Sequence, residues 1–397
     1  MTKDEPQHQS SEKTHGGVDE STSFNCWTTA GDSTLHKTTF SPRAMGPKDV
    51  EIRIHNCGIC ASDIHMMEED WCKLHGEVVP GHEIAGVVVA AGPEALCNVG
   101  DRVGATVLAN TCLECNECMA DREHLCSKKT FVYKDMFKDE CPAPSYGGFA
   151  DRIRLNSEFV YKIPDSIPLD EAAPLFCPGV TAYAALRRAG AGPTTTVGIK
   201  GIGNLGHLAI QFARAFSCKE IIAIADSPTN SDDPITLGAD RLVDFSNPEH
   251  IKAERHKIDI MLVNSFDKST SWKNILRMTA NRGAIVVLAL CNDPIQLPTM
   301  ELVHREIKIA GSFQGSRKDV KDMLAFVEQH KIRPWLVKVP FDQINDGIEL
   351  MKKATARYSI VLEVGGQDSS SAKKDVTEES LAAAAKAQIR EIPTSLE

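Results

Sequence analysis

Short apolar runs separated by glycine, proline and asparagine dominate the first half of the chain. Runs of this kind lie at residues 49–60, 83–92 and 101–108, which read DVEIRIHNCGIC, EIAGVVVAAG and DRVGATVL. Apolar runs of this length with turn residues between them are typical of short strands in an antiparallel barrel. The pattern therefore predicts a small β-barrel domain from about Phe40 onward.

The second half alternates short apolar runs with amphipathic segments. Runs that would fill a parallel sheet lie at residues 194–200, 220–226, 257–265, 283–291 and 305–313. A helix is expected at 316–333, because four apolar residues share one face: Val320, Met323, Leu324 and Val327. A second helix is expected to be capped near Asp170, with Glu171 in its first turn.

Both ends of the chain differ from the middle. Residues 1–22 are polar and charged, and such a segment cannot bury enough apolar surface to offset the entropy of ordering. We therefore expect a disordered arm there. From residue 367 the composition changes to a flexible tail that contains one short Ala-rich helix.

Composition and charge exclude several classes of function. The chain has 397 residues and a net charge of −10, which argues against binding to a phosphate backbone, so no nucleic-acid partner is expected. No apolar run approaches 18 residues, which predicts no membrane span. The 13 cysteines cluster at metal spacings, and the amino-terminal segment lacks an apolar signal core. Together these features predict a reducing, cytoplasmic location.

A glycine motif joins the run at 194–200 to the amphipathic segment after it. The motif is G-x-G-x-x-G and comprises Gly201, Ile202, Gly203, Asn204, Leu205 and Gly206. The first glycine permits a tight turn, the second lets the backbone approach a pyrophosphate, and the third lets helix and strand pack closely. The pyrophosphate would lie at the helix N-terminus. Strand, loop and helix together predict a Rossmann domain that binds a dinucleotide.

Asp226 lies at the end of the next apolar run, about 20 residues after the motif. A carboxylate there can accept the two ribose hydroxyls of NAD and repel the 2′-phosphate of NADP. The surrounding ADSPTNSDD contains no basic residue, which slightly favours NAD. The alternative is that Asp226 faces solvent.

Four cysteines in TCLECNECMADREHLC have the spacing of a closed metal site. They are Cys112, Cys115, Cys118 and Cys126. Four thiolates can close a tetrahedron around one zinc ion and leave no open position, which is typical of a structural site. Bacterial ferredoxins begin with the same spacing, but they continue with x3-C-P, which this chain lacks. Structural zinc is the preferred interpretation, and an iron–sulfur cluster or free thiols are the alternatives.

A second metal site is indicated by CASDIHMMEEDWCKLHGEVVPGHE. Cys60 and His82 would supply two ligands, and a catalytic zinc takes three protein ligands so that one position stays open. The third ligand must come from elsewhere, and Cys177 in APLFCPGVTAY is the candidate. Taken alone, Cys177 is more simply a buried apolar thiol.

The motifs described above resemble those of a known protein family. CGICASDIH followed by PGHEIAGVV, and later PLFCPGVTAY, resembles the zinc-dependent alcohol dehydrogenases of the medium-chain family, most of all its cinnamyl-alcohol-dehydrogenase branch, over roughly residues 25–365. The resemblance implies an α/β fold with a GroES-like β-barrel catalytic domain and a Rossmann doubly wound parallel-sheet domain. It also implies the boundaries: catalytic domain 23–178, cofactor domain 179–315, a return to the catalytic domain at 316–366, and a tail at 367–397.

The resemblance assigns roles to the residues around the open site. Cys60, His82 and Cys177 become the ligands of a catalytic zinc, with Glu83 either beside the metal or a transient ligand, and Cys57 not a ligand. Ser62 and His65 become a proton relay, and Asp63 orients a ligand imidazole. Ala61 departs from the family, which usually has His or Arg there, so a cofactor contact is expected to be missing. The branch usually favours NADP, against the charge argument at Asp226.

The activity implied is reversible hydride transfer between a primary alcohol or its aldehyde and NAD(P)(H). Two zinc ions per chain and a homodimer are implied as well. Met66, Trp71 and Phe131 are candidate walls of the substrate pocket and suggest a bulky or aromatic aldehyde. Two alternatives stay open: a dinucleotide-binding member that has lost turnover, for which Ala61 is the only sign, and a zinc-lobed interaction protein.

Overall fold

The computed structural model describes residues 23–71, 73–133, 135–226 and 232–364. The predicted arm at 1–22, the tail at 367–397 with its Ala-rich helix, and residues 227–231 of the segment after Asp226 lie outside the described residues. No helix in these ranges is long and apolar enough to cross a membrane.

A largely antiparallel sheet forms one half of the molecule and uses strands from both ends of the chain. Its order is β16-β17-β3-β4-β5-β9, and β8 pairs with β3. The strands are β3 (Asp49–Ile59), β4 (Glu83–Ala91), β5 (Arg102–Ala105), β8 (Arg152–Asn156), β9 (Val160–Lys162), β16 (Leu336–Pro340) and β17 (Ser359–Glu363). β17 runs antiparallel to β3, with Ile360 opposite Ile59. β16 and β17, from late in the chain, therefore belong to the same sheet as β3.

Two small sheets complete this half. β6 (Leu108–Asn110) pairs with β7 (Thr130–Phe131), so the run expected at 101–108 is divided between β5 and β6. β1 (Phe24–Thr28) and β2 (His36–Phe40) form a hairpin before the first expected strand. The hairpin escaped prediction because HKTTF is polar and largely exposed. It is held in place by Trp27, whose backbone N–H donates to Phe149 O at 2.9 Å.

A six-stranded parallel sheet forms the other half, in the order β12-β11-β10-β13-β14-β15. The strands are β10 (Thr196–Lys200), β11 (Glu220–Ala225), β12 (Arg241–Asp244), β13 (Ile258–Val263), β14 (Thr279–Val287) and β15 (Lys308–Gly311). All five pairings are parallel. β10 lies at the point where the strand order reverses, which is where ligands bind in open α/β sheets. The predicted doubly wound sheet is confirmed.

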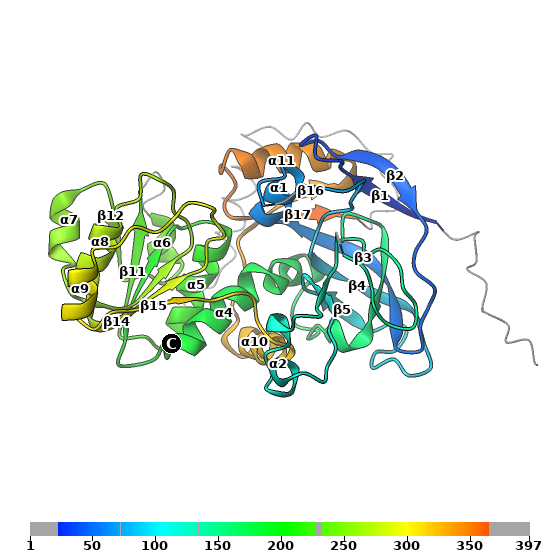
Figure 1. Cartoon of the computed structure of the whole chain (residues 1–397), viewed down its shortest axis with the longest axis horizontal. Coiled ribbons are helices and arrows are strands. Elements are labelled where there is room, and N and C mark those ends of the chain that lie inside the picture. The colour runs from blue at the N-terminus through cyan, green and yellow to red at the C-terminus, as the bar shows by residue number, and fades with distance from the viewer. Residues whose placement is uncertain (1–22, 72, 134, 227–231, 365–397) are drawn as a thin grey trace, which may run out of the picture.

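Helices cover both faces of the parallel sheet and join the two halves (Figure 1). They are α1 (Ala61–Met67), α2 (Asn116–Met119), α3 (Leu169–Ala172), α4 (Pro178–Ala189), α5 (Asn204–Ala215), α6 (Asp232–Thr236), α7 (Pro248–Ala253), α8 (Trp272–Met278), α9 (Thr299–His304), α10 (Arg317–His330) and α11 (Ile344–Lys352). The 3-10 turns are η1 (Glu123–Leu125), η2 (Ser157–Phe159), η3 (Ala173–Phe176) and η4 (Phe341–Gln343). One apolar core lies between the sheet and α4, α5 and α10, and another lies between the sheet and α7 and α8.

The helix expected near Asp170 begins differently from the prediction. Its N-cap residue is Pro168, so Asp170 and Glu171 both lie in the first turn instead. The helix is short, because Pro174 tightens the chain into the 3-10 turn η3. The next helix, α4, has Cys177 at its N-cap position. Cys177 therefore lies between the 3-10 turn η3 and the helix α4, and these two elements fix the direction of its side chain.

Asp319 joins α10 to α4 at the junction of the two halves. It closes a capping box with Ser316 at the start of α10, and it pairs with Arg187 and with Arg188, the latter at 2.8 Å. Burial opposes ionisation of Asp319, but the Ser316 backbone N–H and the two guanidinium groups lower the pKa of this carboxyl below its usual range. Arg188 also lies 3.3 Å from His124 of the cysteine lobe. Asp319 thus fixes three segments at once.

We expect Asp319→Ala to lower the free energy of unfolding by about 3 kcal/mol at neutral pH, because it removes a buried carboxylate that caps α10 and pairs with two partly exposed guanidinium groups. The stabilisation exists above the unfolded-state pKa, so the difference should shrink as the pH falls below about 4. Asp322→Ala on the same helix is the control, since its side chain is 35% exposed and a loss under about 1 kcal/mol is expected. Equal losses in urea unfolding would contradict the role of Asp319.

Candidate active site

Three segments bring a thiol, an imidazole and a second thiol together. Cys60 is the N-cap residue of α1, His82 immediately precedes β4, and Cys177 precedes α4. The Sγ atoms of Cys60 and Cys177 are 3.9 Å apart, and His82 Nε2 lies 3.2 Å from Cys177 Sγ. With a carboxylate oxygen of Glu83, these ligand atoms all lie within 4.8 Å of one another. We call these four residues the metal cradle.

Asp63 contacts both the start of α1 and the His82 imidazole. Its Oδ2 accepts the backbone N–H of Cys60 at 2.9 Å, which caps α1. Its Oδ1 lies 3.0 Å from His82 Nδ1 and accepts the N–H of Gly81 at 3.0 Å. Because the carboxylate can only accept, Nδ1 carries the proton and Nε2 is left to bind a metal ion.

The cradle gathers ionisable groups of the kind that bind a cation. The Cys177 thiol lowers the pKa of Cys60 well below its usual range, and the same contact together with burial raises the pKa of Cys177. Burial, followed by the charge of Cys60, raises the pKa of Glu83 well above its usual range. Both carboxylate oxygens of Glu83 are buried without a hydrogen-bond partner in the described residues. A divalent ion would satisfy these groups, since metal binding displaces their protons.

The dimensions of the cradle fit zinc. With Zn–S bonds of about 2.3 Å, two thiolates on one tetrahedral ion are about 3.8 Å apart. The observed distance of 3.9 Å between Cys60 and Cys177 agrees with this value. A disulfide would bring the sulfurs to about 2.0 Å. Cys57, which was expected not to be a ligand, is buried and is not one of the cradle's ligating groups.

Two residues beside the cradle were not anticipated from the sequence. The Gln314 side-chain amide donates to Cys177 Sγ at 3.5 Å, and the Tyr133 hydroxyl lies 3.3 Å from His82 Nδ1. Gln314 has φ 47, a left-handed backbone conformation that turns the side chain toward the cradle. Neither residue belongs to a motif, and both arrive from loops, so no pattern in the sequence could have indicated them.

Ser62 and His65 lie on α1 and line one large cavity. Ser62 Oγ accepts from Cys60 Sγ at 3.7 Å. His65 Nδ1 lies 2.7 Å from Asp70 Oδ2, and its ring packs against Trp71. The described residues contain no direct hydrogen bond between Ser62 and His65. Ser62 and His65, the predicted relay residues, therefore both line the cavity from α1. Asp70, which the sequence analysis did not include, contacts His65.

The cavity measures about 1330 Å³ and contains the features expected of a cofactor and substrate site. The metal cradle opens into it through Cys60, His82 and Cys177, and all six residues of the glycine loop also line it. The three candidate pocket residues Met66, Trp71 and Phe131 line it as well. Its volume exceeds that of most single-ligand pockets, so there is room for a dinucleotide together with a substrate.

The glycines of the loop have the geometry that their spacing suggested. Gly201 has φ +91, which strongly favours glycine. A Cβ on Gly203 would meet nothing within 4 Å, so the backbone there is open to the cavity. A Cβ on Gly206 would lie 2.1 Å from Gly201 O, which means that only glycine lets α5 approach the strand end. The residues fit a dinucleotide pyrophosphate at the start of α5.

Ala61 lines the cavity as expected, without a charged side chain. Arg357 is the one Lys or Arg among the lining residues that the structure describes. It pairs with Asp233 of α6, and its Nε atom is buried without a hydrogen-bond partner in the described chain. Arg357 is therefore a candidate contact for a cofactor phosphate that sequence reasoning missed.

Asp226 has a largely exposed side chain, as in the alternative that it faces solvent. It follows β11, but its carboxylate pairs with Lys200 Nζ at 3.0 Å, and its side chain is 63% exposed. Ala225 lines the cavity, whereas Asp226 is not among the lining residues. Lys200 is buried and was not anticipated, because it occupies the end of an otherwise apolar run.

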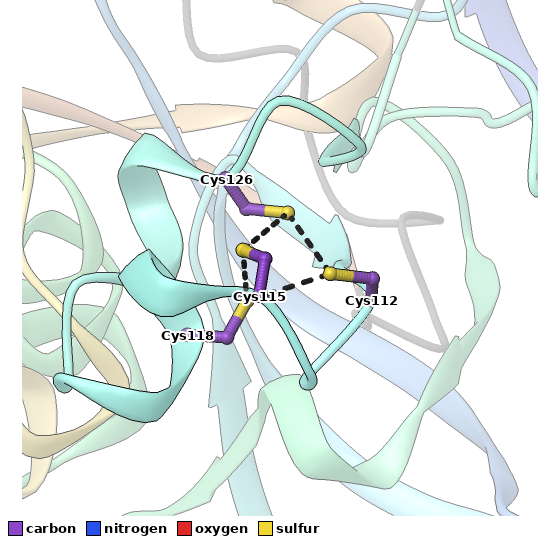
Figure 2. A group of neighbouring side chains, drawn as sticks. All are labelled: Cys112, Cys115, Cys118 and Cys126. Carbon is purple, nitrogen blue, oxygen red and sulfur yellow. Dashed lines mark hydrogen bonds between the residues drawn. The ribbon is translucent and has the colours of Figure 1, made fainter.

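The second cysteine group forms a separate, closed site (Figure 2). Its S–S distances are 3.5 Å for Cys112–Cys126, 3.6 Å for Cys115–Cys118, 3.8 Å for Cys115–Cys126 and 3.9 Å for Cys112–Cys118. All are close to the 3.8 Å edge of one zinc tetrahedron, and they leave no room for a multi-iron cluster. Backbone N–H groups of Glu114 and Cys115 lower the pKa of Cys112 to about 6, which favours the thiolate.

Comparison with known proteins agrees with the fold and the site. The alcohol dehydrogenase GroES-like domain family matches residues 46–165, and the zinc-binding dehydrogenase family matches residues 204–329. The chain is 35% identical to NADP-dependent alcohol dehydrogenase C 1 of Mycolicibacterium smegmatis over 84% of its own length and 96% of that protein. It is 35% identical to probable cinnamyl alcohol dehydrogenase 3 of Oryza sativa subsp. japonica over 85% of its length and 92% of that protein.

A solved structure of a cinnamyl alcohol dehydrogenase from Sorghum bicolor matches with a TM-score of 0.83 and 30% identity, covering 88% of this chain and 100% of that one. The chain therefore belongs to the zinc-binding alcohol dehydrogenases, an NAD(P)-dependent class of enzyme with a GroES-like domain and a Rossmann domain. Within the medium-chain family it is of the cinnamyl-alcohol-dehydrogenase type. The resemblance inferred from the sequence is confirmed.

The two metal sites should differ in lability, because one is closed by four thiolates and the other opens into the cavity. We expect two zinc ions per chain by elemental analysis, of which mild chelation removes one together with the activity. Cys60→Ser should reduce the content to one tightly held ion in folded protein. Active wild-type protein with a single, chelator-resistant zinc would contradict the two-site assignment.

Proposed function

We propose that the chain interconverts primary alcohols and aldehydes with NAD(P)(H), at a catalytic zinc held by Cys60, His82 and Cys177. The observation that carries the proposal is that this cradle and the glycine loop open into the same cavity. When bound, zinc supplies Lewis acidity to the substrate oxygen, and the nicotinamide supplies the hydride acceptor or donor. Glu83 is proposed as a group that can approach the metal in place of substrate. The second zinc at Cys112–Cys126 is proposed to be structural.

The proton is proposed to leave through Ser62 and His65. Ser62 lies next to Cys60 and lines the cavity, so its hydroxyl can accept a proton from the substrate hydroxyl while it passes its own proton onward. His65 is the next group with a titratable nitrogen on the same helix. Since the two are not directly bonded in the described chain, a bridging water would carry the proton from Ser62 to His65. Asp70 Oδ2 lies 2.7 Å from His65 Nδ1 and orients the imidazole ring.

The alternative without turnover has less support. The hypothesis of lost turnover rested on Ala61 alone. Against it, the cradle, the relay residues and the glycine loop all line one cavity. The relatives described above carry the names of enzymes. Arg357 is proposed to replace the cofactor contact that Ala61 cannot make.

The substrate is proposed to be a bulky or aromatic aldehyde and its alcohol. Trp71 and Phe131 line the cavity near the cradle, and Phe131 meets Phe313 edge to face at 6.4 Å. Aromatic walls contribute most to binding when they contact a large apolar group. The names of the rice and sorghum relatives, both cinnamyl alcohol dehydrogenases, agree with this choice.

A homodimer in the cytoplasm is also proposed. β15 ends the parallel sheet, so one of its edges has no partner among the described strands. Met300 and Val303 on nearby α9 and Leu290 after β14 are large and exposed, which suits burial against a second copy. No disulfide joins the described cysteines, in keeping with a reducing compartment.

Ser62→Ala is expected to lower kcat by about 10²-fold or more, because the hydroxyl moves a proton and binds no metal. The zinc content should stay at two per chain, and Ser62→Thr should retain most of the turnover. His65→Gln should be milder, by roughly tenfold. Steady-state kinetics with metal analysis on each variant is the test. Full turnover in Ser62→Ala at neutral pH would exclude the relay.

Phe131→Ala is expected to lower kcat/KM for an aromatic aldehyde such as cinnamaldehyde by about tenfold or more, through lost ring contact. For acetaldehyde, which cannot reach that wall, we expect a change of less than about threefold. The two substrates serve as controls for each other on the same protein preparation. An equal loss for both would show that Phe131 shapes the site without selecting the substrate.

A further inference from the structure

Lys200 is a buried cation at the end of the central strand of the parallel sheet. The residue is 1% exposed, and it is the last residue of β10, directly before Gly201. Its ammonium lies 5.1 Å from the centre of the Phe245 ring. Lysine is almost never fully buried unless it is paired, because removing an ammonium from water is costly. A lysine in this position therefore needs a compensating role.

The ammonium makes two hydrogen bonds within the described chain. It donates to Asp226 Oδ2 at 3.0 Å and to Ser265 O at 3.3 Å. An ammonium carries three donors, so the described residues leave one N–H available. The carboxylate partner is 63% exposed, while the lysine side chain is 2% exposed. The Lys200–Asp226 pair is thus asymmetric, because the ammonium is buried and the carboxylate is exposed to solvent.

The position of this pair is that of the adenosine ribose subsite. β10 lies between β11 and β13, and Asp226 and Ser265 follow those two strands. The residues next to the pair, Gly201 and Ala225, line the cavity, as does Ser265. In a Rossmann domain the end of the second strand meets the ribose, and the first glycine turn meets the pyrophosphate. Lys200 itself is buried and is not among the cavity-lining residues, so its ammonium can reach a ligand only when the exposed Asp226 carboxylate moves aside.

The pair changes the meaning of the Asp226 charge. An unpaired carboxylate there would repel a 2′-phosphate, which was the argument for NAD. Paired with Lys200, the carboxylate is neutralised, and because it is exposed it can turn away from a ligand. A 2′-phosphate could then take its place on the ammonium and use the available N–H.

We propose that Lys200 is a specificity-determining residue that binds the 2′-phosphate of NADP(H), in competition with Asp226. The inference rests on the proposed function, in which a dinucleotide occupies this cavity. It assigns the selectivity to a residue at the end of the central strand β10. Asp226 acts as the counterion that occupies Lys200 when no 2′-phosphate is present.

The test compares two ligands that differ only in the 2′-phosphate: adenosine 5′-monophosphate and adenosine 2′,5′-bisphosphate. Their Kd values are measured by calorimetry for the full chain, for Lys200→Met, for Asp226→Asn and for the double variant. Lys200→Met should reduce the preference for the bisphosphate by about tenfold or more. Asp226→Asn should raise it by a similar factor, because the ammonium loses its competitor. In the double variant that gain should be absent.

Lys219→Met is the matched control for the loss of one positive charge. Lys219 is exposed and precedes β11, at the opposite end of the strand from Asp226, so the preference should change less than twofold. An unchanged preference in Lys200→Met, equal losses for both ligands, or a gain from Asp226→Asn that persists without Lys200 would each overturn the proposal. Asp226 is exposed, so its variant tests the proposal even if Lys200→Met does not fold. Neither ligand carries nicotinamide, so the absence of turnover would contradict the proposed function and leave this test intact.

Discussion

The structure depends on one electrostatic constraint, the convergence of buried ionisable groups in the metal cradle. Two cysteines and the Glu83 carboxyl group converge on His82, and both Glu83 oxygens are buried without a hydrogen-bond partner in the described chain. Such groups are buried favourably in their charged form only when an ion balances them. The cradle therefore has the donor set of a metal site, and the neighbouring residues are arranged to hold its ligands. Asp63 does this most directly, because it fixes both the start of α1 and the His82 ring.

The same constraint explains where the two halves of the molecule meet. Cys177 belongs to the turn before α4, and Gln314 reaches it from the segment after β15, so the cradle is built at the junction. Arg188 connects α4 to Asp319 of α10 and to His124 beside the closed zinc site. Arg188 therefore links the lobe of the closed site to α4, the helix that begins at Cys177. Because the glycine loop lies across the same junction, a bound cofactor would face the cradle within one cavity.

Local patterns in the sequence predicted most of the fold and much of the site. The glycine spacing, the four-cysteine spacing and the apolar runs each depend on neighbouring residues, and the structure shows the expected loop, lobe and sheet. Contacts between segments that are far apart in the sequence could not be predicted from these local patterns. The Lys200–Asp226 pair joins the ends of two strands, and the contact of Gln314 with Cys177 joins two segments far apart in the chain. Neither contact follows from a periodic pattern of residues in the sequence. The β1–β2 hairpin was missed for a different reason, because its second strand is too polar to resemble one.

The central claim is that the cradle binds zinc in the native enzyme, and crystal diffraction at the zinc absorption edge tests it most directly. The account predicts two anomalous peaks per chain. One should lie about 2.3 Å from the Sγ atoms of Cys60 and Cys177 and about 2.0 Å from His82 Nε2, and the other should lie among the four lobe cysteines. A single peak in the cysteine lobe of catalytically active crystals, with a Cys60–Cys177 disulfide or an empty cradle, would contradict it.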